Sequence, residues 1–274
     1  MVKDQRAAQG GSAARRGKRR SRRHADVHTG DGAPRRDAFI PRRPTVPPAF
    51  HQRWENLLFL HWPIPVERLR PLVPSELDID TFDGFAWVSM SPFWASRTRA
   101  HGLPAMPIVG DSHEVNLRTY VSAGEVPGVW FLSIDASNPL AVVGARLGFS
   151  LPYYFAWMSF EERGESFRFR STRLHPCTPR AALDVQWTRG AALPTAPPSS
   201  RDYFLVERYC LYALRSGRVC RGRIAHERWP IHAAEVHSFS SSILEPFGLE
   251  VSEAPVAHAQ GHPLDVDIWT LENR

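Results

Sequence analysis

The sequence predicts a mainly β fold with a few short helices, in a single domain over residues 49–274 that follows a basic tail over 1–48. Three observations predict it: short apolar runs recur between turn residues, several glycine turns stand between strand-like runs, and strands do not alternate regularly with helices. Of the 274 residues, 43% are hydrophobic and 23% charged, which is ordinary for a soluble globular protein. We therefore expect an antiparallel sheet.

The first expected element is a buried strand over the apolar run 54–60, which the prolines at 63 and 65 should end. Apolar residues then recur at helical spacing over 66–73, and Pro65 precedes them, where a missing N–H is tolerated. A short helix is therefore expected over 66–73.

Glycine turns predict four hairpins. Asp83-Gly84 is the strongest of these signals, because a tight hairpin turn requires positive φ. The expected strand pairs are 77–82 with 85–93, 113–121 with 129–135, 153–160 with 165–170, and 209–214 with 218–226. Single strands are expected at 183–188 and 264–268.

The best helix candidate is the apolar segment 140–149. Asn138 is a favoured N-cap residue, and Pro139 suits the first helical position. A shorter helix is expected over 201–207.

The net charge of +6 lies in the tail. Residues 1–43 hold 13 of the 34 Lys and Arg but four of the 28 Asp and Glu, which gives +9 there and leaves about −3 for the rest. The tail has almost no large apolar residues, so we expect it to be disordered. Nucleic-acid binding is therefore expected only through the tail, if at all.

Several classes of site are excluded. The chain has neither a glycine-rich phosphate loop nor a GxSxG nucleophile motif. His113-Glu114 begins like a zinc-protease motif, but Leu117 stands where the second histidine is required, and His258 and His262 would lie about 13 Å apart on a strand. We expect no metal and no cofactor.

The three cysteines, Cys177, Cys210 and Cys220, form no CxxC pair, and no apolar run is long enough for a membrane span. A cytoplasmic protein without membrane association is the resulting expectation. The sequence does not indicate an oligomeric state.

The segment 114–121 carries the clearest chemical pattern. Glu114, Asn116, Arg118 and Tyr120 alternate with apolar or small residues, so a strand would place all four on one face. An acid, an amide, a guanidinium and a phenol suit the wall of a cavity for a carboxylate or carbonyl ligand. An ordinary solvent-facing strand explains the same alternation. A buried Arg118 would require a partner such as Glu114 to balance its charge.

Five segments follow one another in a family-specific order: 54–63, 69–74, 80–88, 114–120 and 151–153. Through them the chain resembles the YqjF-like family of unknown function over nearly everything after residue 50. The family is similar in fold to acetoacetate decarboxylase, which implies an antiparallel β-barrel or cone around an internal cavity. The resemblance also implies, approximately, that Glu114 stands where decarboxylases carry an active-site acid.

One departure from the decarboxylases is decisive. Their helix leads into a Pro-Lys-Lys element that supplies the Schiff-base lysine, and here the matching residues are Pro152, Tyr153 and Tyr154. The only lysines are Lys3 and Lys18, both in the tail. The resemblance therefore implies a cavity without imine chemistry, with Tyr153 at the lysine position and Tyr154 on the opposite strand face.

Three functions follow from these features. The first is binding or conversion of a small carbonyl or carboxylate compound, with Glu114 and Tyr153 as catalytic acid and base and with Asn116, Arg118 and Tyr120 as ligand-binding residues. The second is a non-catalytic module whose cone is filled by side chains. The third is association with nucleic acid through the tail. Whether the chain is an enzyme is not decided by the sequence.

Overall fold

The computed structural model describes residues 43–104 and 110–273, and all structural statements below refer to them. The expected tail therefore lies almost wholly outside the described residues, and its disorder stays a prediction. Within the described ranges no helix is long and apolar enough to cross a membrane.

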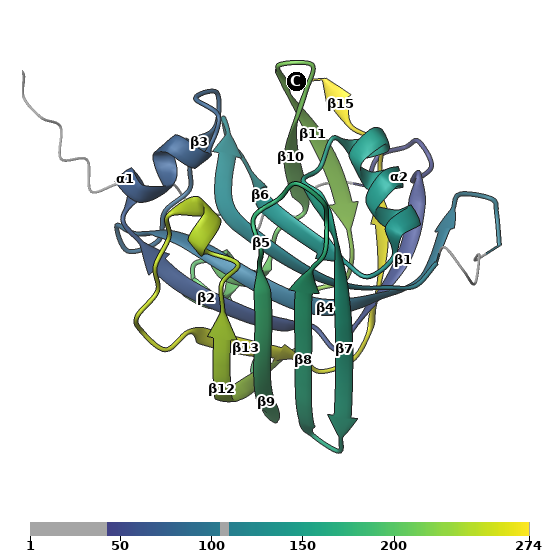
Figure 1. Cartoon of the computed structure of the whole chain (residues 1–274). Coiled ribbons are helices and arrows are strands. Elements are labelled where there is room, and N and C mark those ends of the chain that lie inside the picture. Colours follow the sequence, from purple (N-terminus) through teal and green to yellow (C-terminus); the bar gives the residue numbers. More distant parts are fainter. Residues whose placement is uncertain (1–42, 105–109, 274) are drawn as a thin grey trace, which may run out of the picture. The chain divides into compact units, whose positions relative to one another are not determined.

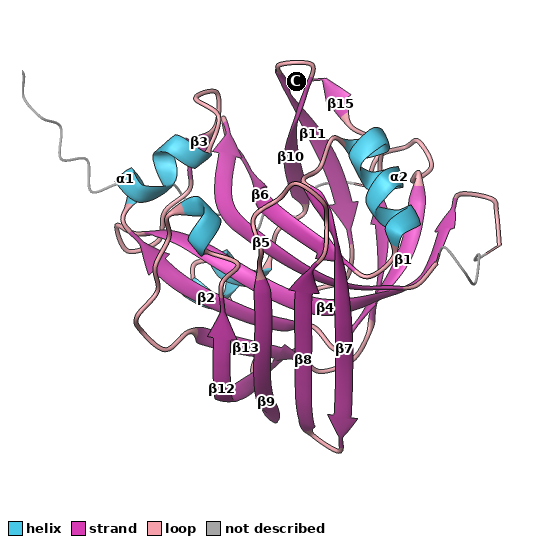
Figure 2. Cartoon of the chain, in the orientation of Figure 1, coloured by secondary structure: helices cyan, strands magenta, loops and turns pink. Residues whose placement is uncertain are grey.

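Strands dominate the described residues, and the helices are short (Figure 2), which confirms the predicted fold class. The strands are β1 (Phe50–Glu55), β2 (Leu58–Ile64), β3 (Asp78–Ile79), β4 (Ala86–Ala100), β5 (Ser112–Ala123), β6 (Val126–Ala136), β7 (Tyr153–Arg163), β8 (Ser166–Arg173), β9 (Ala182–Ala192), β10 (Cys210–Arg215), β11 (Arg218–Ala225), β12 (Ile231–Ser241), β13 (Val256–Gln260), β14 (Leu264–Ile268) and β15 (Glu272–Asn273). The helical segments are α1 (Val66–Leu69), η1 (Arg70–Leu72), α2 (Pro139–Phe149), α3 (Arg201–Val206) and η2 (Glu245–Phe247).

The strands form two closed circuits that share β4, β5 and β6 (Figure 1). One circuit, here called the cavity circuit, runs through β1, β14, β11, β10, β6, β5 and β4 and closes because β1 pairs with both β14 and β4. The other, here called the filled circuit, runs from β6 through β7, β8, β9, β12, β13 and β2 back to β4 and β5.

The filled circuit encloses the larger apolar core. Alternate residues of the shared strands point into it, among them Met90 on β4 and Leu117 on β5. Leu60 of β2 is the cross-strand partner of Met90 and is buried in the same core, together with Phe169 of β8 and Val185 of β9. Because these residues are almost fully buried, this half of the fold is held together mainly by apolar packing.

Helix α2 begins as the sequence predicts. The side chain of Asn138 accepts hydrogen bonds from the backbone N–H groups of Leu140 and Ala141, and Pro139 occupies the first turn. The helix connects β6 to β7, which pair in parallel over three residues. The sheet departs from the expected antiparallel pairing at this point and at the short parallel pairing of β10 with β6.

The expected strand at 54–60 is also wrong in detail, because two strands divide this run. Asn56 adopts a positive φ of 51° between β1 and β2, so the chain turns there. Strand β2 then continues through Pro63 to Ile64. Proline is tolerated there because the pairing of β2 with β13 ends at His61, so that Pro63 is paired with β4 alone.

Asp83 and Gly84 do form the expected turn, with φ values of 51° and 79°. However, only Phe82 and Phe85 pair across it. The expected strand 77–82 shortens to β3, which pairs with β5 rather than with β4. The other three predicted hairpins are present, as β5–β6, β7–β8 and β10–β11.

Candidate functional site

A cavity of about 270 Å³ lies within the cavity circuit, and α2 lies along its edge. Residues of all seven strands of this circuit line it, together with Val206 at the end of α3 and the loop residues Arg208, His226 and Trp229. On β5 the lining residues are Ser112, Glu114, Asn116 and Arg118, the even-numbered face that the sequence pattern indicates. Tyr153, at the start of β7, completes this wall.

Neighbouring strand β4 carries two buried hydroxyl groups beside this part of β5. Ser89 and Ser91 stand opposite Arg118 and Asn116 in the β4–β5 register, and their hydroxyl oxygens lie 3.3 Å apart. Cross-strand partners point to the same face of a sheet, so these hydroxyls lie on the side of Arg118. The core residue Met90 points the other way, into the filled circuit.

Glu114 and Tyr153 form a hydrogen-bonded pair. The phenol of Tyr153 donates to Oε2 of Glu114 over 3.0 Å. Burial raises the pKa of Glu114 to about 7, although the bond from Tyr153 opposes the rise. Burial and the nearby Glu114 hold the pKa of Tyr153 well above its ordinary value. The pair therefore combines a carboxyl that titrates near neutrality with a phenol that stays protonated.

Arg118 is a buried residue with two hydrogen-bond donors that have no partner among the described residues. Its residue is 9% exposed, and its Nε and Nη2 atoms have no hydrogen-bond partner among the described residues. These two nitrogens form one edge of the guanidinium, the edge that binds a carboxylate with two parallel hydrogen bonds. Burial lowers the pKa of Arg118 while Tyr120 opposes this, but a guanidinium stays charged in proteins.

The expected pairing of Arg118 with Glu114 is absent from the described residues. Glu114 takes its hydrogen bond from Tyr153 instead, and the guanidinium lies 5.5 Å from the ring centre of Phe59. The two charged side chains are four residues apart on one strand, about 13 Å along it, which is too far for an ion pair without bending.

Tyr120 lies on the same strand face but does not line the cavity. Its hydroxyl donates to the carbonyl of Leu205 over 2.7 Å and lies 3.0 Å from Nδ1 of His61. Its ring packs against Phe204, with 5.0 Å between ring centres. Tyr120 therefore packs and bonds against α3 and His61 rather than lining the cavity.

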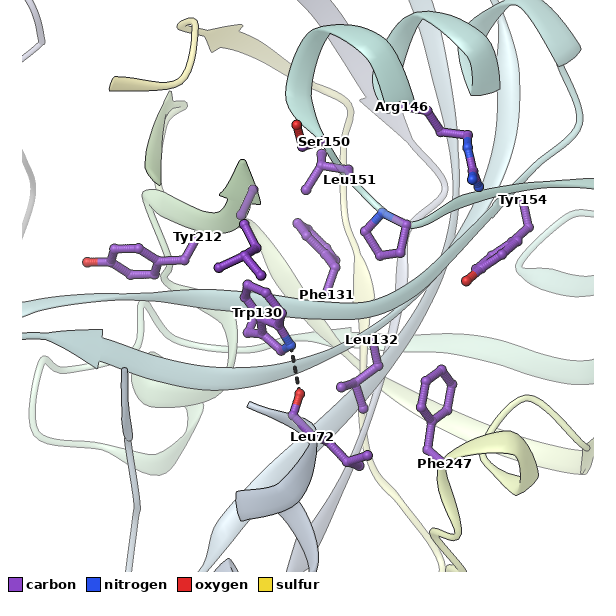
Figure 3. Close-up of a pocket in the computed structure, with 13 residues that line it drawn as sticks. Leu72, Trp130, Phe131, Leu132, Arg146, Ser150, Leu151, Tyr154, Tyr212 and Phe247 are labelled. Carbon is purple, nitrogen blue, oxygen red and sulfur yellow. Dashed lines mark hydrogen bonds between the residues drawn. The ribbon is translucent and has the colours of Figure 1, made fainter. Parts of the chain in front are cut away.

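Tyr154 points away from the cavity, as its place in the strand predicts. It lines a second, more open pocket of about 510 Å³ with Trp130, Tyr212 and Phe247 (Figure 3). Its ring lies 4.3 Å from the guanidinium of Arg173, which forms a buried ion pair with Asp135.

Four residues of the cavity wall carried no clear sequence signal: Trp54, Arg208, His226 and Trp229. Arg208 is bonded to Asp80 over 3.0 Å. Burial lowers the pKa of His226 to about 4, so it is neutral, and its Nδ1 lies 2.6 Å from the carbonyl of Glu227. Arg208, His226 and Trp229 lie in or beside loops, where no periodic pattern marks the side-chain direction.

The described part of the chain shows no candidate metal centre. Within the described ranges no group of three or more His, Cys, Asp or Glu side chains is arranged to hold an ion. His258 is buried with Nε2 3.3 Å from Asp202, whereas His262 is exposed beyond the end of β13. The only lysines of the chain, Lys3 and Lys18, lie outside the described residues.

Comparisons with solved structures show the fold. The enduracididine biosynthesis enzyme MppR superposes with a TM-score of 0.60 at 11% identity, covering 84% of this chain and 88% of MppR. An acetoacetate decarboxylase-like enzyme from Sphingomonas wittichii RW1 gives a TM-score of 0.53 at 14% identity, over 86% of this chain and 98% of that one. The predicted acetoacetate-decarboxylase-like fold is therefore confirmed.

Sequence comparisons show the family. The uncharacterized protein YqjF of Bacillus subtilis (strain 168) is 38% identical over 221 residues, which cover 80% of this chain and 90% of YqjF. The family model of an uncharacterized conserved protein, DUF2071, matches residues 51–262, nearly the whole described domain. As the resemblance to YqjF predicted, the chain belongs to the DUF2071 family.

Proposed function

We propose that the cavity binds a small carboxylate that also carries a carbonyl group, and that Glu114 and Tyr153 convert it by acid–base chemistry without an imine. The observation that carries the proposal is the polar wall of β5. One end holds a buried guanidinium with two unpartnered donors, and the other holds a carboxyl with a pKa of about 7 beside a phenol.

In this proposal Arg118 holds the carboxylate through its free edge. Glu114, once ionised, takes a proton from the carbon next to the carbonyl group. The negative charge that develops on the carbonyl oxygen is stabilised by a hydrogen bond from Tyr153, which stays protonated because burial and Glu114 raise its pKa. In this step the proton moves from the ligand to Glu114, and the negative charge moves from Glu114 to the enolate oxygen.

Structural neighbours support the ligand class. MppR has been solved in complex with pyruvate and with the condensation product of pyruvate and imidazole 4-carboxaldehyde. These relatives share the fold at about 10% identity, and the amine chemistry of the decarboxylases has no counterpart at Tyr153. The proposal therefore keeps the ligand class and replaces the covalent step by proton transfer.

Deuterium exchange tests the chemistry. Pyruvate in D₂O should lose its methyl proton signal faster with the protein than without it, as followed by proton NMR. Glu114→Gln should abolish the acceleration, and Tyr153→Phe should reduce it. The matched controls are Glu125→Gln, on the exposed turn of the same hairpin, and Tyr154→Phe, outside the cavity. Exchange that persists in Glu114→Gln would overturn the mechanism.

Borohydride tests the absence of an imine. Reduction in the presence of pyruvate should leave no adduct within residues 50–274, because that range contains no lysine. A reduced adduct there would contradict the proposal. Pyruvate binding without any exchange would favour the non-catalytic module, although a filled cone is disfavoured by the cavity of about 270 Å³.

Nucleic-acid association through residues 1–48 stays a separate prediction. A chain that begins at residue 45 should lose any affinity for DNA or RNA and the salt dependence that accompanies phosphate contacts. Equal binding by the shortened chain would place the contact on the domain, whose net charge is about −3 after residue 43.

A further inference from the structure

The cavity is much less polar than its β5 wall. Aromatic rings from four other elements and from the loop that follows β11 line it: Phe50, Trp54, Phe93, Phe131, Phe149 and Trp229. Several of these rings pack on one another, with 5.4 Å between the ring centres of Trp54 and Phe93 and 6.0 Å between those of Trp54 and Trp229. An acid of three carbons would contact the β5 wall and leave this aromatic surface uncovered.

The polar groups outside β5 are largely satisfied by the protein itself. Gln52 accepts a hydrogen bond from the indole of Trp54 over 2.8 Å, and His226 is neutral and bonded to a backbone carbonyl. Arg208 is paired with Asp80. Since Arg118 alone of these groups has two unpartnered donors on one edge, a carboxylate is expected there and an apolar body elsewhere.

Cavity size agrees with a larger ligand. The volume of about 270 Å³ is about nine times the ~30 Å³ that a water molecule takes in the liquid. Pyruvate fills only part of such a space. Burying a further apolar group against aromatic side chains removes its surface from water and stabilises the complex.

Helix α2 borders the cavity with small and apolar residues. Leu140, Ala141, Gly144 and Ala145 line the edge of the cavity, yet only Val142 of this helix is fully buried. Leu140, Val143 and Leu147 are 53%, 53% and 79% exposed. The helix therefore packs lightly over the edge and presents apolar side chains to the solvent beside it.

We propose that the physiological ligand is a monocarboxylic acid with an apolar alkyl or aryl body, whose carboxylate binds Arg118 and whose body packs against the aromatic wall. This inference rests on the proposed function in using the same cavity and the same arginine. It goes beyond the proposed function by naming the chemical class of the ligand. In this inference the apolar body of the ligand, rather than its carbonyl group, makes most of the contacts with the cavity.

Calorimetric titration with straight-chain acids from acetate to hexanoate tests the proposal on the unmodified protein. Each methylene buried in the cavity contributes about 0.8 kcal/mol, so affinity should rise about fourfold per added carbon until the cavity is full. Hexanol, which has the chain without the charge, should bind at least tenfold more weakly than hexanoate because it leaves Arg118 unpaired.

Variants locate the two ends of the ligand. Arg118→Lys should weaken hexanoate binding, whereas Arg163→Lys, a control whose side chain is 87% exposed, should not. Gly144→Leu should weaken hexanoate binding by a larger factor than acetate binding. A Cβ at Gly144 would meet no atom within 4 Å, so the first atom of the new side chain needs no displacement of its neighbours.

The outcomes separate the two proposals. Affinity that is flat or falls with chain length, while pyruvate still binds through Arg118, would overturn the apolar-body inference and leave the proposed function standing. If neither pyruvate nor any acid of the series binds, both proposals are wrong. Binding of hexanol as tight as that of hexanoate would contradict the role of the carboxylate.

Discussion

Glu114→Gln should make the protein more stable at alkaline pH. Burial raises the pKa of Glu114 from 4.5 to about 7. Between these two pH values the carboxyl group is protonated in the folded protein but ionised in the unfolded chain. The stability associated with this proton is fully present below about pH 4.5 and is lost as the pH rises to about 7. At about 1.36 kcal/mol per pH unit, the loss over this window is on the order of 3 kcal/mol. Glutamine keeps the size and has no proton to lose.

Urea unfolding at about pH 4.5 and at about pH 8.5 measures this effect. The stability of Glu114→Gln minus that of the unmodified protein should rise by on the order of 3 kcal/mol between the two conditions. Other buried groups, such as Asp135 and His226, titrate in both proteins and cancel in the difference. The same measurement on the exposed Glu125→Gln should show no comparable change. A constant difference, or a loss of stability at high pH, would refute the reasoning and restore an ion pair with Arg118.

Three further substitutions test other parts of the fold by urea unfolding. Asp135→Asn should cost roughly 3 to 5 kcal/mol, because it leaves Arg173, whose side chain is 2% exposed, without its partner 2.7 Å away; a cost below about 1 kcal/mol would contradict this. Gly84→Ala should cost about 1 kcal/mol because its φ is 79°, whereas Gly148→Ala within α2 should stabilise by up to about 1 kcal/mol. Asn138→Ala should cost about 1 kcal/mol through loss of the helix cap, and an unchanged midpoint would exclude a capping contribution.

Local signals predicted much of this structure. The period of two over 114–121 placed Glu114, Asn116 and Arg118 on one face, and the structure brings them to one cavity with Tyr153. Asn138 and the glycine turns marked their elements because a cap and a positive φ depend on a few adjacent residues. These features could be predicted because their physical causes lie within short segments.

Features that depend on distant contacts could not be predicted. Tyr120 follows the same alternation as Arg118, but α3, about 85 residues later, covers its end of the strand and accepts its hydroxyl hydrogen bond. Strands β12 and β13 were not expected, because Ile231–Ser241 and Val256–Gln260 carry few large apolar residues and pair far along the chain. The turn at Asn56 interrupts an apolar run without glycine or proline.

The cavity circuit and the filled circuit share strands β4, β5 and β6. A bulge in β6 determines which of its side chains face each circuit. Leu117 of β5 pairs with Ser133 of β6, but the next residue, Arg118, pairs with Phe131. Leu132 therefore has no partner on β5 and is the extra residue of the bulge. With strict alternation Phe131 and Ile134 would face opposite sides, yet both line the cavity. Leu132, meanwhile, packs in the core of the filled circuit. Because a bulge re-aims side chains in this way, the wall beside Arg118 is aromatic, whereas Ser133 faces the filled circuit with Leu117. The apolar environment of Arg118, whose Nε and Nη2 atoms have no partner among the described residues, therefore arises in part from one inserted residue on the neighbouring strand.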